Sequence, residues 1–133
     1  MVIGAGAGLG TKKQSGQTPL RFGCFPVMSF LVFYITCPDE PTAHSIAQHL
    51  LEHRLVACAN IFPITSAYWW QGAIQREGEW VCIVKTGKDW EEKVEAAVQR
   101  IHPYEVPCIM RFEARANAAY ERWVEEEVSG FGV

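Results

Sequence analysis

Cysteine and histidine are the residue types of this 133-residue chain that could bind a metal ion or supply a reactive thiol. The five cysteines are Cys24, Cys37, Cys58, Cys82 and Cys108. Because their number is odd, their spacing wide and no C-x-x-C occurs, the sequence predicts neither a zinc ribbon, a thioredoxin motif nor a disulfide framework. The last three lie in apolar stretches, so we expect small buried hydrophobes. Free thiols favour a reducing compartment, here the cytoplasm.

Two histidines, His49 and His53, stand four residues apart in an expected helix. Histidines at this spacing lie on one helix face and can share a metal ion. No third ligand accompanies them in the sequence, so a solvated helix face is the favoured interpretation and a metal site the alternative.

Residues 1–28 differ in composition from the remainder and are expected to form a flexible Gly-rich extension to a single domain at 29–133. The glycines at 4, 6, 8 and 10 miss both the G-x-G-x-x-G and the Walker spacing, and no strand precedes them. Phosphate binding is therefore not predicted. The segment also lacks the basic start and apolar core of a secretory signal.

The charge of the chain argues against nucleic acid as a partner. Of the 12 basic side chains, three lie in the first 27 residues, where there is no acidic residue; the other 9 face 15 acidic residues. A body with a net charge near −6 lacks the basic face of a nucleic-acid-binding domain. No apolar stretch approaches the length of a membrane span, so no membrane partner is predicted.

The elements that would position these side chains follow the order β-α-β-β-α-β and a final helix. Asp39, Asp89 and Asn117 are expected to cap the three helices. The order is that of the ferredoxin-like α+β fold, in which helices cover one face of a four-stranded sheet. The expected strands are 30–36, 57–70, 79–86 and 108–114, and the expected helices are 40–54, 90–101 and 118–128.

The central hairpin carries apolar side chains on both faces. Trp80, Cys82 and Val84 point to one face, and Val81 and Ile83 to the other. A turn is expected at 71–78, and a bulge or bend at the proline of the first strand. Since the helices cover only one face, the other face must be covered by a second layer or another subunit, which predicts an oligomer.

Five stretches together resemble the CutA family, a family of small proteins named for divalent-cation tolerance. The similarity extends over about residues 30–128, with the motifs in order. They are TCPDE at 36–40, LVACANIFP at 55–63, SAYWWQG at 66–72, the Glu79, Lys85 and Thr86 pattern of the hairpin, and HPYEVP at 102–107.

This resemblance implies a homotrimer that packs sheet face to sheet face, with the hairpin reaching a neighbour. It implies a non-enzymatic role in tolerance of copper or other divalent cations. An architecture similar to that of PII signalling proteins implies the alternative, a sensor or scaffold with a small molecule or partner protein bound between subunits. A hydrolytic or acid–base enzyme using Glu79, Lys85 and His102 ranks last, because no nucleophile lies beside a base in a recognised arrangement.

The resemblance also implies two sets of site residues. For copper or a related ion, the metal ligands would be Cys37 and His102, a soft thiolate and an imidazole. Two ligands are too few for a tight site in one subunit. A second set would gather in a cleft between subunits and bind a small anionic or zwitterionic ligand, or only form interface contacts such as a Glu79–Lys85 ion pair. The cleft set is Trp70, Glu77, Glu79, Lys85, Tyr104 and Glu105.

Overall fold

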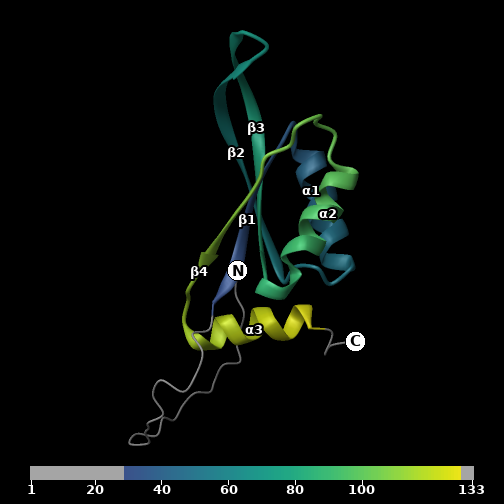
Figure 1. The fold of residues 1–133 in the computed structure, drawn as a ribbon, viewed down its shortest axis with the longest axis vertical. Coiled ribbons are helices and arrows are strands. Elements are labelled where there is room, and N and C mark those ends of the chain that lie inside the picture. Colours follow the sequence, from purple (N-terminus) through teal and green to yellow (C-terminus); the bar gives the residue numbers. More distant parts are fainter. Residues whose placement is uncertain (1–28, 130–133) are drawn as a thin grey trace, which may run out of the picture.

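The computed structural model describes residues 29–129, so the expected extension at 1–28 lies outside the described residues. The four strands form one antiparallel sheet with the order β2-β3-β1-β4. This confirms the predicted ferredoxin-like α+β fold with a further C-terminal helix (Figure 1). The elements are β1 (Phe30–Cys37), α1 (Glu40–Glu52), β2 (Cys58–Trp70), β3 (Ala73–Thr86), a 3₁₀ turn η2 (Lys88–Trp90), α2 (Glu91–Ile101), β4 (Ile109–Ala114) and α3 (Ala118–Val128).

Two of the three predicted helix caps are at the predicted residues, Asp39 before α1 and Asn117 before α3. Asp39 caps α1 as predicted, because its carboxylate accepts a hydrogen bond of 2.9 Å from the backbone N–H of Thr42. The predicted cap at Asp89 is wrong: Asp89 lies inside η2, and Trp90 precedes α2. At Asn117 the cap is made by the backbone carbonyl, which accepts from the N–H of Tyr120 and Glu121, rather than by the side chain.

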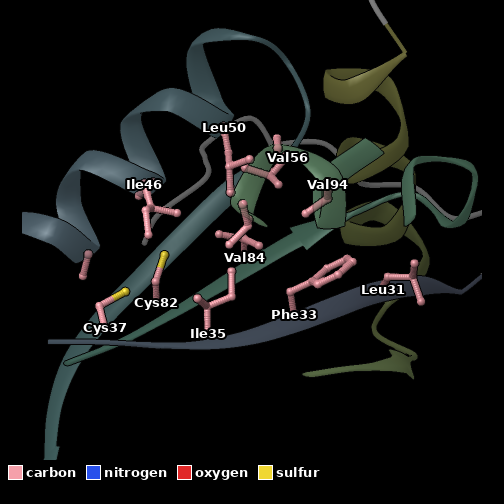
Figure 2. Close-up of a cluster of buried hydrophobic side chains, with 14 residues drawn as sticks. Leu31, Phe33, Ile35, Cys37, Ile46, Leu50, Val56, Cys82, Val84 and Val94 are labelled. Carbon is pink, nitrogen blue, oxygen red and sulfur yellow. The ribbon is translucent and has the colours of Figure 1, made fainter. Parts of the chain in front are cut away.

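The main core lies between the sheet and the pair α1 and α2. Alternate residues of β1 and β3 point into it, and α1 contributes the apolar stripe on one of its faces (Figure 2). The predicted assignment of the hairpin side chains to the two faces of the sheet is confirmed, since Cys82 and Val84 belong to this core and Ile83 points to the other face. The sticks drawn in Figure 2 include Leu31, Phe33, Ile35, Cys37, Ile46, Leu50, Val56, Cys82, Val84 and Val94.

The hairpin of β2 and β3 is longer than predicted. Its turn is only Gln71 and Gly72, with φ values of 52° and 82°, and β3 begins at Ala73, so the predicted turn at 71–78 is wrong. Two central residues with positive φ are typical of the tight turn whose twist matches the strands. Pro63 causes no bulge, because the pairing continues from Phe62 through Ile64 without an extra residue. β2 is an edge strand, the kind of strand in which proline is tolerated.

The sheet face turned away from α1 and α2 is here called the free face. At one end α3 packs on it, where Val124 meets Phe30 and Val32, beside Tyr120 and Trp123. Figure 1 shows α3 lying across this end, while the hairpin extends from the opposite end. Between them, Met110 and Phe112 of β4 are 48% and 50% exposed. None of the helices between residues 29 and 129 has the length and apolar character needed to cross a membrane.

Candidate functional site

A hollow of about 790 Å³ lies on the free face, beyond the part that α3 covers. Its floor is formed by side chains from β1, β2 and β3, and its rim by the loop that joins α2 to β4. The residues that line it are Tyr34, Thr36, Ile64, Thr65, Ser66, Ala67, Tyr68, Trp70, Glu79, Tyr104, Glu105, Val106 and Cys108. The lining contains two carboxylates and four aromatic rings, and no lysine or arginine of the described part of the chain contributes to it.

Glu79 lies in the hollow and is only 6% exposed. One of its oxygens accepts a hydrogen bond of 2.6 Å from the hydroxyl of Ser66, and the other accepts one of 2.6 Å from the hydroxyl of Tyr104. A carboxyl group that only accepts on both oxygens has the pattern of an ionised carboxylate. Among residues 29–129, no lysine, arginine or histidine forms an ion pair with it. Glu79 is thus a buried carboxylate that has no positively charged partner among the described residues.

The phenols beside Glu79 remain protonated. The hydroxyl of Tyr68 donates to Glu77, and this hydrogen bond raises the pKa of Tyr68 to about 12, with smaller effects from desolvation and the charges of Glu77 and Glu79. Burial first, and then the hydrogen bond to Glu79, raise the pKa of Tyr104 well above its ordinary value. Both phenols can therefore act as hydrogen-bond donors at any physiological pH.

The structure brings most of the predicted cleft set together. Trp70, Glu79, Tyr104 and Glu105 line the hollow, and Glu77 reaches its edge through Tyr68. Lys85 lies elsewhere: it is six residues from Glu79 along β3, which corresponds to about 20 Å of extended strand.

Near the other end of the free face, Lys85 has its own set of contacts. Its amine donates to the side-chain oxygen of Asn60 at 2.9 Å and stands 5.6 Å from the ring centre of Tyr120. The expected Glu79–Lys85 pair is therefore not made within one chain.

The predicted metal ligands do not form a preformed site. His102 is 8% exposed and both of its ring nitrogens are in use: Nδ1 accepts from the backbone N–H of Tyr104 at 3.1 Å, and Nε2 donates to the carbonyl of Thr36 at 2.8 Å. Cys37 is fully buried in the core on the helix side.

Burial, followed by the charges of Glu79 and Asp39, raises the pKa of the Cys37 thiol to about 11, so it is a neutral thiol at pH 7. A copper-like ion needs a thiolate and a free imidazole nitrogen. The pair therefore does not fit the ion that the sequence suggests.

The other candidate ligands are also dispersed. Between residues 29 and 129 no group of three or more His, Cys, Asp and Glu side chains is arranged to hold a metal ion. The rings of His49 and His53 lie 4.3 Å apart, and Nδ1 of His53 donates to the carbonyl of His49. Cys58 and Cys82 are buried as predicted, but Cys108 is exposed and lines the hollow. Cys108 precedes β4 rather than starting it, which explains the wrong prediction.

The residues of the hollow that the sequence interpretation missed include three with hydroxyl groups, Tyr34, Ser66 and Tyr68. A signal for two of them was available. Counting back by twos from Trp70 along an extended strand reaches Tyr68 and then Ser66, so all three share one face. The register also pairs Ser66 with Glu77 and Ile64 with Glu79, which places the Ser66 hydroxyl beside both carboxylates. Tyr34 had no such local signal, because β1 lies two strands away from β2.

Comparisons with known proteins agree with this fold. A relative from Thermotoga maritima, "Divalent-cation tolerance protein CutA", is 38% identical over 99 residues, which cover 74% of this chain and 98% of the relative. The solved structure of the "Periplasmic divalent cation tolerance protein CutA from Archaeoglobus fulgidus" superposes with a TM-score of 0.72 at 39% identity, covering 76% of this chain and 99% of the other. The structure of CutA from Synechococcus elongatus gives 0.74 at 30% identity, covering 78% and 94%.

The family model described as "CutA1 divalent ion tolerance protein" matches residues 31–127, which is nearly the whole described domain. The match runs from the second residue of β1 to the last but one of α3 and includes all the residues that line the hollow. By this match and by these relatives, the chain belongs to the CutA1 divalent ion tolerance protein family.

Proposed function

We propose that the protein contributes to tolerance of divalent cations as a non-enzymatic homotrimer, and that it does so by binding a small molecule in the hollow on the free face. The observation that carries this proposal is the hollow itself: about 790 Å³, lined by four aromatic rings and a buried carboxylate. A concave site of this size with a few placed polar groups is the usual form of a small-molecule site.

Several features support the two parts of the proposal. The relatives carry the name divalent-cation tolerance protein, which describes a response rather than a reaction. The apolar side chains of Met110 and Phe112 on the free face support assembly through that face. The free thiols of Cys37, Cys58 and Cys82 support a reducing compartment such as the cytoplasm.

Direct binding of copper or a related ion at Cys37 and His102 is the second version of this function. Only the residue types, a thiol and an imidazole, favour metal binding there, since the Cys37 thiol is protonated at pH 7 and both ring nitrogens of His102 are hydrogen-bonded. To bind a metal ion there, the protein would break two hydrogen bonds of His102 and expose a core residue. The geometry therefore supports the small-molecule version over this one.

The test uses three isosteric probes, benzylammonium, benzoate and benzyl alcohol, in titrations of the assembled protein followed by ligand-observed NMR. Two adjacent tryptophans give a matched pair of variants: Trp70 lines the hollow, and Trp69, which is 71% exposed, does not. We expect at least one probe to bind, and Trp70→Ala but not Trp69→Ala to abolish that binding. If none of the three probes binds, or if both variants behave alike, the hollow is not the ligand site.

A parallel titration with copper(I), copper(II), zinc and nickel distinguishes metal binding at Cys37 and His102 from small-molecule binding in the hollow. We expect no stoichiometric site that disappears in the double variant Cys37→Ser with His102→Ala. A saturable site that this double variant removes would establish the metal version instead.

A further inference from the structure

We propose that the hollow is selective for an organic cation, and that a primary ammonium or guanidinium group is held between Glu79 and the rings of Tyr34, Tyr68, Trp70 and Tyr104. The inference rests on the proposed function, since it names the chemical class that the same hollow takes. It replaces the anionic or zwitterionic ligand expected from the sequence.

The first argument is the charge of the site. Glu79 and Glu105 line the hollow. Glu77 accepts a hydrogen bond from Tyr68, which also lines it, so three carboxylates lie in or beside the hollow. The cation that made a zwitterionic ligand plausible, Lys85, lies about 20 Å away along β3. The imidazole of His102 is locked by the backbone at Thr36 and Tyr104. An anion would therefore meet these carboxylates and, among the described lining residues, no lysine or arginine.

The second argument is that Glu79 is buried without a counter-charge. Glu79 is 6% exposed, and its only partners in the described chain are the hydroxyls of Ser66 and Tyr104. Buried charges in proteins are normally paired with an opposite charge or bound to a cation. Each oxygen of Glu79 has accepted one hydrogen bond, and a carboxylate has about four acceptor positions, so a positive donor can still be added from the side of the hollow.

The third argument is the aromatic lining. Four aromatic rings from three segments of the chain line the same hollow: Tyr34 from β1, Tyr68 and Trp70 from β2, and Tyr104 from the loop between α2 and β4. The face of an aromatic ring attracts ammonium and guanidinium groups, and several rings around one site form the cages that proteins use for organic cations. A bare metal ion fits less well, because beside Glu79 it would find carbon faces and hydroxyls that already donate to carboxylates.

The cationic group has two sources, a free amine or a lysine from a second copy of this chain. Lys85 is the lysine that lies on the same sheet face, and among the described residues it forms no ion pair with a carboxylate. A neighbour packed against the free face could place its Lys85 where the chain itself cannot. Both sources use the same chemistry at Glu79.

The experiment compares the affinities of benzylammonium, benzoate and benzyl alcohol for the assembled protein at pH 7. We expect benzylammonium to bind at least tenfold more tightly than either isostere, and Glu79→Gln, which keeps the shape of the side chain, to weaken it by about tenfold or more. Glu113→Gln is the matched control, because Glu113 is an exposed carboxylate that faces Lys88 away from the hollow. Circular dichroism checks that each variant folds.

The variant Lys85→Met separates the two sources. If a free amine is the occupant, Lys85→Met leaves the benzylammonium affinity unchanged. If the partner's lysine fills the hollow, Lys85→Met raises that affinity about tenfold, and Lys85→Met and Glu79→Gln weaken assembly to the same extent.

Binding of benzoate or benzyl alcohol in preference to benzylammonium, or an unchanged benzylammonium affinity in Glu79→Gln, would overturn the charge selectivity while leaving the hollow as a ligand site. Absence of binding by all three probes, in wild type and in Lys85→Met, would overturn both proposals.

Discussion

At the scale of single residues, burial determines which thiols can react. Cys37 and Cys82 lie in the core, and desolvation raises their pKa values to about 11 and about 12. Cys108, with the same chemistry, is exposed at the hollow. Because the thiolate is the reactive form, the difference in environment predicts a large difference in reactivity.

Native labelling with iodoacetamide at pH 8 should therefore modify Cys108 quickly and leave Cys37 and Cys82 unmodified until the protein is unfolded. Mass spectrometry of the digested protein assigns each site, and Cys108→Ala should remove the fast reaction at that peptide. Labelling of Cys37 in the folded protein at a rate close to that of Cys108 would contradict the described burial.

The raised pKa of Cys37 makes the free energy of unfolding depend on pH in the alkaline range. The pKa of Cys37 is about 11 in the folded chain and 9.0 as the ordinary value, so folding opposes loss of this proton. The stabilising contribution is complete below pH 9 and is lost as the pH rises through about 11. Urea unfolding between pH 8 and 11 should show a falling free energy of unfolding, and a smaller fall in Cys37→Ala. Cys108→Ala should show the same fall in the free energy of unfolding as wild type. If this free energy falls equally with pH in wild type, Cys37→Ala and Cys108→Ala, Cys37 does not cause the pH dependence.

At the scale of elements, the two-residue turn controls the hairpin. Gly72 has a φ of 82°, which an L-residue adopts at a cost of about 1–2 kcal/mol. We expect Gly72→Ala to lower the free energy of unfolding by about that amount in urea titrations. Gly78 is the control: it lies in β3, has no atom within 4 Å of an added Cβ, and gains about 0.5–1 kcal/mol when replaced by alanine. A neutral Gly72→Ala would mean that the turn is not formed as described.

The elements also show how far local patterns in the sequence reach. Alternation in 80–84 predicts which side chains face the helices, because strand geometry is local. The glycine at 78 misled the prediction of the turn, since glycine is common in turns but is also tolerated within a strand where nothing needs its side chain.

For the candidate site, the single chain brings together Trp70, Glu79, Tyr104 and Glu105 of the set expected from the sequence. The contacts of His102 and Lys85 had no local signal in the sequence, because their partners, Thr36 and Asn60, are 66 and 25 residues distant.

At the scale of the whole molecule, the exposed apolar side chains of the free face predict that copies of the chain assemble through this face. Light scattering should give a mass near three chains of 15.0 kDa. Phe112→Glu should lower that mass, because it places a charge on the free face at a side chain that is 50% exposed in the single chain. Leu51→Glu is the control: Leu51 is 37% exposed, but it lies on α1 at the other side of the sheet. If wild type is a monomer, or both variants keep the same mass, the free face is not the interface.

The edge strand β4 has a consequence for the life of a newly made chain. It presents unpaired backbone groups together with Met110 and Phe112, and until another surface covers it, it is a template for pairing with any other exposed strand. The hazard grows with the concentration of uncovered chains and with the time each one spends uncovered. Slow synthesis at low temperature therefore favours soluble protein over aggregates, whereas a rapid burst of synthesis favours the reverse.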